Sequence, residues 1–236
     1  MNKKLLLLVV CAIFAVGQIN AQWGGKNYIN VSWVNQTLEN KDNGLKWKSD
    51  FGVSLVKGTT YYLHPNALWG MVKFGIDWTQ LDLNYAKLKE QFEINPREQV
   101  SNEYLKELDV EDLNLGKHQL EYSMHVGPSV TVNPINLLKI HAYFRYAPSF
   151  SAVICDNEYG DTQFSGAFGN FFVTGAAVAY KFISLGVEYR WGSGKYKTYG
   201  YDASAVTDDL DTDDIITSTK SKMNTSSTRI FVSFRF

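Results

Sequence analysis

The last seven residues, 230–236, read I-F-V-S-F-R-F, and this stretch decides the fold. Ile230, Val232, Phe234 and Phe236 occupy every second position, with Ser233 and Arg235 between them. Successive side chains of a β-strand point to opposite faces, so this period of two predicts a strand with one ring-rich apolar face. The strand ends on an aromatic residue.

The same alternation recurs upstream and predicts eight strands in all. The apolar rows predicted to face outward in the other seven are Ile29, Val31 and Trp33; Phe51, Val53 and Leu55; Val72, Phe74, Ile76 and Trp78; Leu120, Tyr122, Met124 and Val126; Ile140, Ala142, Phe144 and Tyr146; Phe172, Ala176, Val178, Tyr180 and Phe182; and Leu185, Val187, Tyr189 and Trp191. Lys57 interrupts the second strand, which predicts a bulge there. The opposite rows carry charge and glycine.

The gaps between these strands alternate in length. Turn-forming residues predict tight turns at 64–67, 133–136 and 183–184, and longer loops at 36–45, 86–116, 154–170 and 200–223. Short periplasmic turns and long external loops are typical of an outer-membrane barrel. We therefore expect an all-β fold, an eight-stranded antiparallel up-and-down transmembrane β-barrel. The alternative is a soluble β-sandwich or lipocalin-like barrel, in which the apolar rows would face inward.

The N-terminus predicts export. A basic start at Lys3 and Lys4 precedes an apolar run and a small residue, Ala21, which is the layout of a cleaved signal peptide. The run is shorter than the roughly 20 residues of a spanning helix. We expect a signal peptide at 1–21, a barrel domain at 22–236 and an outer-membrane location. The mature chain keeps one cysteine, Cys155, which excludes an intrachain disulfide, and a net charge of −1 argues against a nucleic-acid partner.

The signal peptide, the eight strands and the terminal I-F-V-S-F-R-F together resemble small bacterial outer-membrane barrels of the OmpA/OmpX type. The resemblance implies that Ile230, Val232, Phe234 and Phe236 form the signal read by the barrel-assembly machinery. The stretch M-V-K-F-G-I-D-W-T-Q-L-D-L-N-Y at 71–85 is also similar to a motif of a narrower family of uncharacterised outer-membrane barrels. Neither resemblance implies an activity.

Charged residues in the opposite rows predict a network inside the barrel. Its members are Asp50, Lys73, Asp77, Glu121, Arg145, Glu188, Arg190 and Arg229. The interior of an eight-stranded barrel is just wide enough for side chains to fill, and buried charges must be paired. We therefore favour a packed polar network that fixes the strand register. The alternative is a narrow water or ion path lined by charged rings.

Two histidines on neighbouring strands, His125 and His141, are candidates for chemistry. A metal site or acid–base pair needs a third convincing ligand, so we expect hydrogen-bonded structural histidines, no metal and no cofactor. A lipid-modifying enzyme would need a nucleophile beside a base on the outward rim, and His125 with Ser123 or Ser129 is the nearest approach. His125 alternates to the inner side, which disfavours that hypothesis.

The predicted external loops carry the remaining signals. Asp209, Asp211 and Asp213 have the opening spacing of a calcium loop, but Asp214 and Lys220 occupy its glycine and glutamate positions. A solvated loop tip is expected, with weak divalent bridging to lipopolysaccharide as the alternative. The stretch 99–113 predicts a short helix that would cap the barrel or dock a partner.

The predicted function is a non-enzymatic outer-membrane barrel with a structural or surface-interaction role through its loops. Its expected partners are outer-membrane lipids, lipopolysaccharide, the barrel-assembly machinery and a surface ligand. The alternatives are a narrow pore or transport component and a lipid-modifying enzyme.

Overall fold

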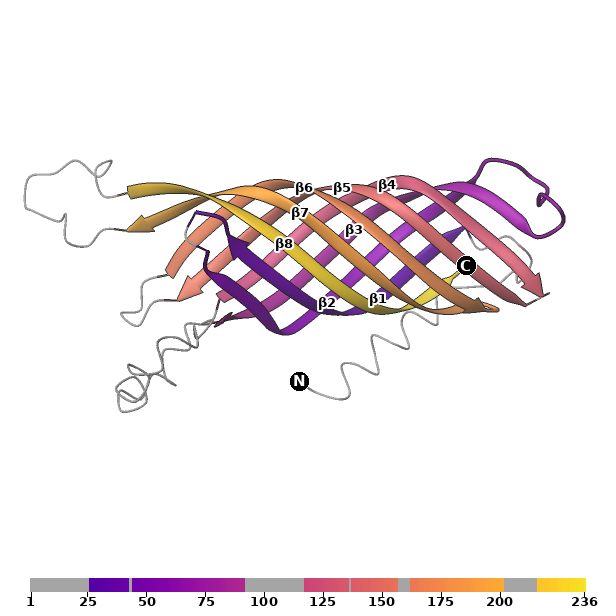
Figure 1. Cartoon of the computed structure of the whole chain (residues 1–236), viewed down its shortest axis with the longest axis horizontal. Coiled ribbons are helices and arrows are strands. Elements are labelled where there is room, and N and C mark those ends of the chain that lie inside the picture. Colours follow the sequence, from indigo (N-terminus) through magenta and orange to yellow (C-terminus); the bar gives the residue numbers. More distant parts are fainter. Residues whose placement is uncertain (1–25, 43, 92–116, 136, 157–161, 202–215) are drawn as a thin grey trace, which may run out of the picture.

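The structure is a closed barrel of eight antiparallel strands (Figure 1). It is a computed structural model that describes residues 26–42, 44–91, 117–135, 137–156, 162–201 and 216–236. The strands are β1 (Asn27–Asn40), β2 (Lys46–Tyr62), β3 (Val72–Gln91), β4 (Lys117–Ile135), β5 (Leu138–Asp156), β6 (Thr162–Tyr180), β7 (Ile183–Tyr201) and β8 (Ile216–Arg235). None of the described residues forms a helix long and apolar enough to cross a membrane.

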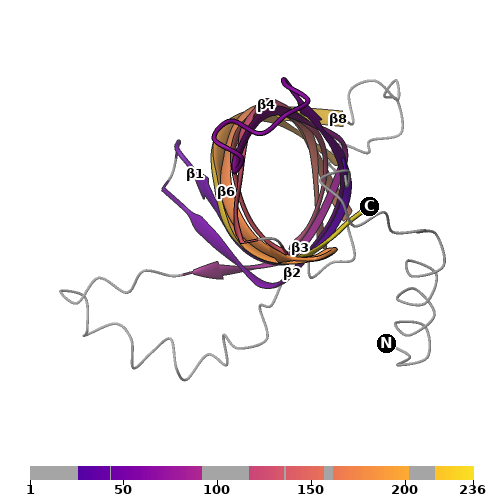
Figure 2. The same ribbon diagram turned by 90° about the vertical axis from the view of Figure 1, so that its right-hand side faces the viewer.

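The last strand closes the ring by pairing with the first. β8 pairs antiparallel with β1 from Tyr28 opposite Arg235 to Asn40 opposite Met223. Backbone hydrogen bonds of 3.0 Å between Asn27 and Phe236, in both directions, finish the seam. Figure 2 shows the resulting ring of strands end-on. Closure leaves no open sheet edge, which is the condition for a sheet to lie in hydrocarbon.

Three connections between strands lie at one end of the barrel and four at the other. At the turn end, as we call it, the strands are joined by residues 63–71, 136–137 and 181–182. At the other, the loop end, the connections are 41–45, 92–116, 157–161 and 202–215. Lys181 turns the chain with a positive φ of 55°. The third turn therefore precedes the predicted 183–184, because Ile183 already pairs with Tyr180.

The outer surface confirms the predicted assignment of sides. Trp33, Phe74, Phe144 and Val232 are 55, 44, 45 and 39% exposed, whereas a soluble barrel would bury them. Every strand contributes large exposed apolar side chains to this surface. An apolar surface that extends around the whole ring far exceeds what soluble proteins expose, and it requires a membrane to cover it.

Two bulges change the register of the alternation. The bulge predicted in β2 at Lys57 is absent: the consecutive residues Lys57 and Gly58 pair with Leu81 and Thr79, so the extra residue, Gln80, belongs to β3. Lys57 simply continues the outward row of β2. The bulge of β2 lies at Asp50 instead, because Ser49 and Phe51 pair with the adjacent residues Leu88 and Lys87. In β3 the pairing with β4 shifts between Thr79 and Asp82. Each extra residue exchanges the inward and outward positions beyond it.

The strands continue well beyond the apolar belt toward the loop end. Much of the predicted loops 36–45, 154–170 and 200–223 is strand, since β1 runs to Asn40, β6 begins at Thr162 and β8 at Ile216. In β1, β7 and β8 these predictions were wrong because the polarity of the alternation reverses there, whereas the outward row of β6 stays apolar, with Phe164 and Phe168 exposed. Outward positions become polar, as at Lys195, while inward positions become apolar, as at Tyr196.

Some predictions lie outside the described residues. They are the signal peptide at 1–21, the helix at 99–113 and the acidic run at 208–214.

Candidate functional site in the barrel lumen

The first charged cluster lies in the part of the lumen nearest the turn end. Asp77 of β3 accepts hydrogen bonds from Arg145 Nη2 at 2.5 Å and Nε at 3.2 Å. Thr60 Oγ1 donates to its other carboxylate oxygen at 2.7 Å, and His141 Nε2 lies 3.1 Å from Oδ2. Arg145 also stacks over the ring of Tyr143, with the guanidinium carbon 3.5 Å from the ring centroid. A fully buried carboxylate is thus surrounded by donors from β2 and β5.

The second cluster occupies the middle of the lumen and is centred on Arg229 of β8. Its Nη1 donates to Asp82 Oδ2 at 2.7 Å and to Glu188 Oε1 at 3.2 Å. Glu188 accepts a further hydrogen bond of 2.7 Å from the hydroxyl of Tyr143, and His125 Nε2 lies 3.1 Å from Asp82 Oδ2. Asp82 and Arg229 are completely buried. One guanidinium therefore joins carboxylates from two strands that are not neighbours, β3 and β7.

The third cluster lies closer to the loop end. Arg190 of β7 forms an ion pair with Glu121 of β4 and donates a 2.8 Å hydrogen bond from Nη2 to Ser149 Oγ. Its guanidinium carbon lies 3.9 Å from the ring centroid of Phe171. The pair spans the lumen, because β4 and β7 do not pair in the sheet. Both side chains are almost completely inaccessible to solvent.

An uncharged hydrogen-bonded layer follows toward the loop end. Gln36 Nε2 donates to Gln119 Oε1 at 2.7 Å, and Asn84 Nδ2 donates to Gln36 Oε1 at 2.8 Å. Gln119 Nε2 and the hydroxyl of Tyr196 both donate to Ser151 Oγ, at 2.7 and 2.9 Å. These amides and hydroxyls come from five strands and cross-link the lumen without charge.

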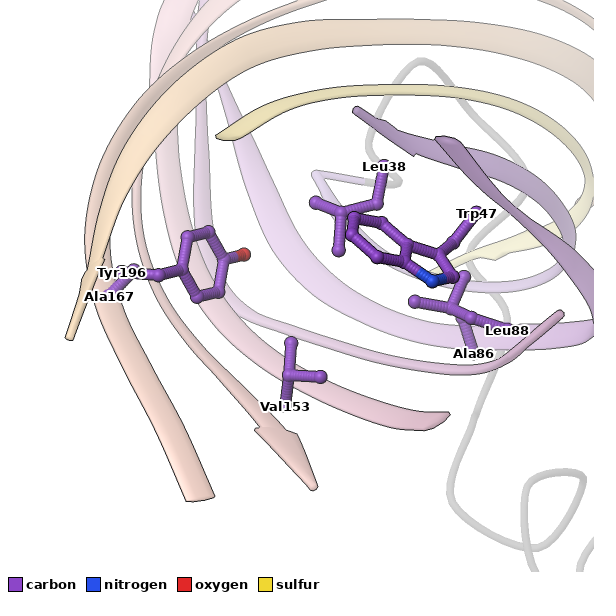
Figure 3. Packing of buried hydrophobic residues seen from close by; sticks show 7 residues of the cluster. All are labelled: Leu38, Trp47, Ala86, Leu88, Val153, Ala167 and Tyr196. Atoms are coloured by element: carbon purple, nitrogen blue, oxygen red, sulfur yellow. The ribbon is translucent and has the colours of Figure 1, made fainter. Parts of the chain in front are cut away.

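Apolar side chains form a buried cluster in the lumen beyond that layer. We call this group the apolar plug; it consists of Leu38, Trp47, Ala86, Leu88, Val153, Ala167 and Tyr196, all at most 4% exposed. Figure 3 shows the larger ones reaching inward from different sides of the wall. Lys117 Nζ lies 3.9 Å from the ring centroid of Trp47. The lumen therefore changes from charged to apolar along its length.

Seven of the eight residues predicted for the lumen network lie inside the barrel, and Asp50 does not. Asp50 is exposed and forms an ion pair of 3.2 Å with Lys89 on the outer surface. The bulge between Ser49 and Phe51 moves it to the outer face. Lys73 stands apart from the three clusters, near the turn end, where its Nζ donates to Pro65 O at 2.9 Å.

Among the described residues, Asp82 is the charged lumen residue that sequence reasoning missed. Alternation from Val72, Phe74, Ile76 and Trp78 assigns even-numbered positions of β3 to the outside. The bulge between Thr79 and Asp82 reverses this assignment, so Asp82 points inward. The sequence does contain a sign of this reversal: Asp82 is an acidic residue between two leucines, Leu81 and Leu83, where continued alternation would place it facing lipid.

His125 and His141 both point inward and hydrogen-bond within the wall. His125 Nε2 lies 2.9 Å from Ser123 Oγ and 3.1 Å from Asp82 Oδ2. A hydrolytic triad needs serine and carboxylate on opposite ring nitrogens, whereas here both approach the same one. Within the described residues, no group of three or more His, Cys, Asp and Glu side chains is arranged to hold a metal ion.

The closed ring, its apolar outer belt and its charged lumen define the class: the fold is that of small outer-membrane β-barrels, as in the OmpA/OmpX type. No family model and no curated protein matches the sequence.

Several solved structures are similar in fold. The neisserial surface protein NspA is 13% identical, covering 89% of this chain and 97% of its own, with a TM-score of 0.41. Ail of Yersinia pestis, solved with sucrose octasulfate, is 7% identical, covering 90 and 99%, with a TM-score of 0.42. The outer membrane protease OmpT of Escherichia coli is 10% identical, covering 94 and 99%, with a TM-score of 0.49. These similarities concern the fold alone.

Proposed function

We propose that the protein is a non-enzymatic integral outer-membrane barrel with a closed lumen, and that it acts at the cell surface through its loop end. In this proposal the signal peptide at 1–21 is removed, residues 22–236 form the barrel, and the turn end faces the periplasm. The lumen charges then serve stability by holding distant strands in register.

The packed lumen is the observation that carries this proposal. Three ion-pair clusters, the amide layer and the apolar plug succeed one another along the barrel axis. Arg229 and Arg190 each join strands on different sides of the wall. The buried charges form ion pairs with one another next to an apolar plug, and this arrangement suits a structural role. Conducting lumens are instead lined by polar groups that water can reach.

Planar-bilayer recording tests the closed lumen. The refolded protein is checked for folding by its electrophoretic mobility before and after heating, and is then added to a bilayer. We expect no discrete current steps above the lipid background. A double variant, Arg190→Ala with Glu121→Ala, removes a charged cross-link and provides the comparison with a widened lumen. Reproducible unitary currents from the folded parent protein would overturn the proposal.

A narrow water or proton path is the second candidate, and one observation favours it. Some buried polar atoms of the clusters, including Arg145 Nη1, Arg229 Nη2 and Glu121 Oε2, have no hydrogen-bond partner among the described protein atoms. Such atoms are suited to binding water. Vesicles that contain the protein and a trapped pH dye distinguish this candidate, because only a continuous path speeds proton equilibration over that of empty vesicles.

A lipid-modifying activity is the weaker alternative, since His125 and Ser123 are buried inside the lumen rather than at the lipid surface. Mass analysis of lipid A from cells with and without the protein tests it. An unchanged acyl pattern is expected.

We also propose a role for the C-terminal residues of β8 in assembly of the barrel in the membrane. Ile230 and Val232 are exposed on the outer face of β8, and Phe234 and Phe236 continue the row to the C-terminus. We propose that this row is read by the barrel-assembly machinery. Removing Phe236 should slow the appearance of heat-modifiable protein in cells, while the same variant should still refold in detergent.

A further inference from the structure

The lumen holds more cations than carboxylates, and the surplus lies at the turn end. The three clusters contain three arginines and four carboxylates. Outside the clusters, the lumen also contains Lys73, Lys139 and Arg235. Lys73 and Lys139 are the second residues of β3 and β5, and Arg235 is the last residue of β8. Figure 2 looks at the ring from this end. These three residues define what we call the cationic mouth.

The side chains of the cationic mouth lie close to one another. Lys139 interacts electrostatically with both Arg235 and Lys73, and like charges repel. The guanidinium carbon of Arg235 lies 5.3 Å from the ring centroid of Tyr28, and its Nη1 donates to Thr60 Oγ1 at 3.4 Å. Both of these contacts are with neutral groups. Cations held together at the end of a lumen therefore need an anion to offset their repulsion.

The sequence near this end contains no carboxylate that could neutralise them. The turns at 63–71, 136–137 and 181–182 contain no Asp or Glu, and neither do residues 1–26. Asp77, in the cluster nearest the mouth, already accepts two hydrogen bonds from Arg145 and lies beside His141. Even with the α-carboxylate of Phe236 counted, three cations outnumber one negative charge. The missing anion is therefore sought outside the chain.

A buried hydroxyl without a partner lies beside the cationic mouth. Ser184 is 1% exposed, and its Oγ forms no hydrogen bond with any atom of the described residues. Ser184 lies opposite Ser233 in the β7–β8 pair, which makes Arg235 its diagonal neighbour on the inner face, within reach of a long side chain. On its other side, Ala179 separates Ser184 from Lys139. Buried hydroxyls are normally paired, so this one is suited to donate to a ligand held by the cations.

We propose that the cationic mouth binds the phosphate group of a small soluble phosphate compound. The Arg235 guanidinium offers a planar pair of donors to phosphate oxygens, and the ammonium groups of Lys139 and Lys73 act as point charges. Ser184 Oγ adds a neutral donor. A phosphate monoester carries a charge of about −1.5 to −2, which suits three clustered cations better than the single charge of a carboxylate.

The direction of these side chains favours a soluble phosphate over a lipid headgroup. Arg235 contacts Tyr28 and Thr60, both buried inside the ring, and Lys139 lies opposite Ala179 on the inner face. A solute that enters the mouth meets these groups directly, whereas a lipid on the outer wall does not. The site adds a ligand to the structural role of the lumen and is independent of whether the lumen conducts.

Phosphorus NMR tests the site with inorganic phosphate and, separately, glycerol 3-phosphate. The protein is refolded in dodecyl maltoside, a detergent without phosphate, and line broadening measures the Kd. The test variant carries Lys139→Gln and Arg235→Gln; the matched control carries Lys48→Gln and Lys57→Gln, two exposed lysines of β2. Because charged hydrogen bonds to phosphate are strong, the test variant should bind about 10- to 100-fold more weakly. The control should bind within about threefold of the parent protein, since salt screens distant surface charges.

Ser184→Ala separates a direct contact from a general effect of charge, because it leaves every charge in place. It should weaken binding of both phosphates about 3- to 10-fold. Ser227→Ala is its control: Ser227 Oγ is also buried without a partner, but lies deeper, opposite Arg190. Binding to that variant should equal binding to the parent protein.

Short-chain phosphatidylglycerol in the same detergent distinguishes a lipid headgroup from a soluble phosphate. Binding of the lipid alone, with no broadening of either soluble phosphate by the parent protein, would overturn the proposal. Equal losses in the test and control variants would overturn it as well. Heat-modifiable mobility of each variant shows separately whether the barrel is folded, so a failed site is distinguishable from a failed fold.

Discussion

Replacing Arg229 with methionine tests the idea that lumen charges stabilise the barrel by pairing. Arg229 Nη1 is shared between Asp82 and Glu188, at 2.7 and 3.2 Å, and all three side chains are buried. Methionine keeps much of the volume but leaves two carboxylates without their common cation. Removing one partner of a buried ion pair costs about 3–5 kcal/mol, and His125 and Tyr143 remain to bind the carboxylates. We therefore expect a loss of about 3 kcal/mol in the free energy of unfolding.

Urea titration of protein folded in lipid vesicles measures this loss, with the heat-modifiable band as the readout of folding. For a slope of about 1–3 kcal/mol per molar urea, the midpoint should fall by roughly 1–3 M. The matched control is Asp50→Asn, which breaks the exposed pair with Lys89 and should cost less than about 1 kcal/mol. Adding Glu188→Gln to Arg229→Met should recover part of the stability. Equal midpoints for Arg229→Met and Asp50→Asn would refute the reasoning.

Three further substitutions, one of them a control, probe the packing of the wall and lumen. Gly127→Ala places a Cβ against the carbonyl oxygen of Phe144 and 2.7 Å from Arg145 Cα, so the β4–β5 pair must separate; a loss of about 1–3 kcal/mol is expected in the same titration. Gly166→Ala, whose nearest contact is 3.5 Å away, should change the midpoint little, and a larger effect there would contradict this account. Tyr143→Phe removes the 2.7 Å hydrogen bond to Glu188 and should cost about 1–3 kcal/mol, whereas a stability equal to that of the parent would show that Arg229 alone satisfies the carboxylate.

The sequence predicted the membrane-embedded half of the barrel because one physical rule governs every strand there. Apolar side chains face lipid and polar ones face the lumen, so the row through Phe74 and Trp78 was assigned correctly. The rule fails at bulges, where one inserted residue reverses the faces. Asp50 was therefore placed inside and Asp82 was overlooked. A bulge depends on pairing with the neighbouring strand, which a single strand's alternation does not reveal.

The strand residues near the loop end of the barrel were not predicted, for a different reason. On β7, the outward residues beyond Trp191 become polar, and an apolar plug replaces the charged network inside. Leu38, Trp47 and Tyr196 then follow the rule of a soluble barrel, and residues such as Lys195 are solvated. A strand segment with polar residues outside and apolar residues inside does not fit the pattern expected of a lipid-facing strand, so it was predicted to be a loop. The charged partners across the lumen were also unpredictable individually, since Arg190 with Glu121 and Arg229 with Asp82 join strands that do not pair.

Collisional oxygen accessibility along β8 tests the assignment of sides most directly. Spin-labelled cysteines replace Ile230, Phe231 and Val232 one at a time in a Cys155→Ser background, with the protein folded in lipid vesicles. Three successive residues share nearly the same depth, so accessibility to oxygen, which concentrates in hydrocarbon, reports the face rather than the height. The account predicts high accessibility at 230 and 232 and low accessibility at 231. High accessibility at 231, with protection at 230 and 232, would contradict it.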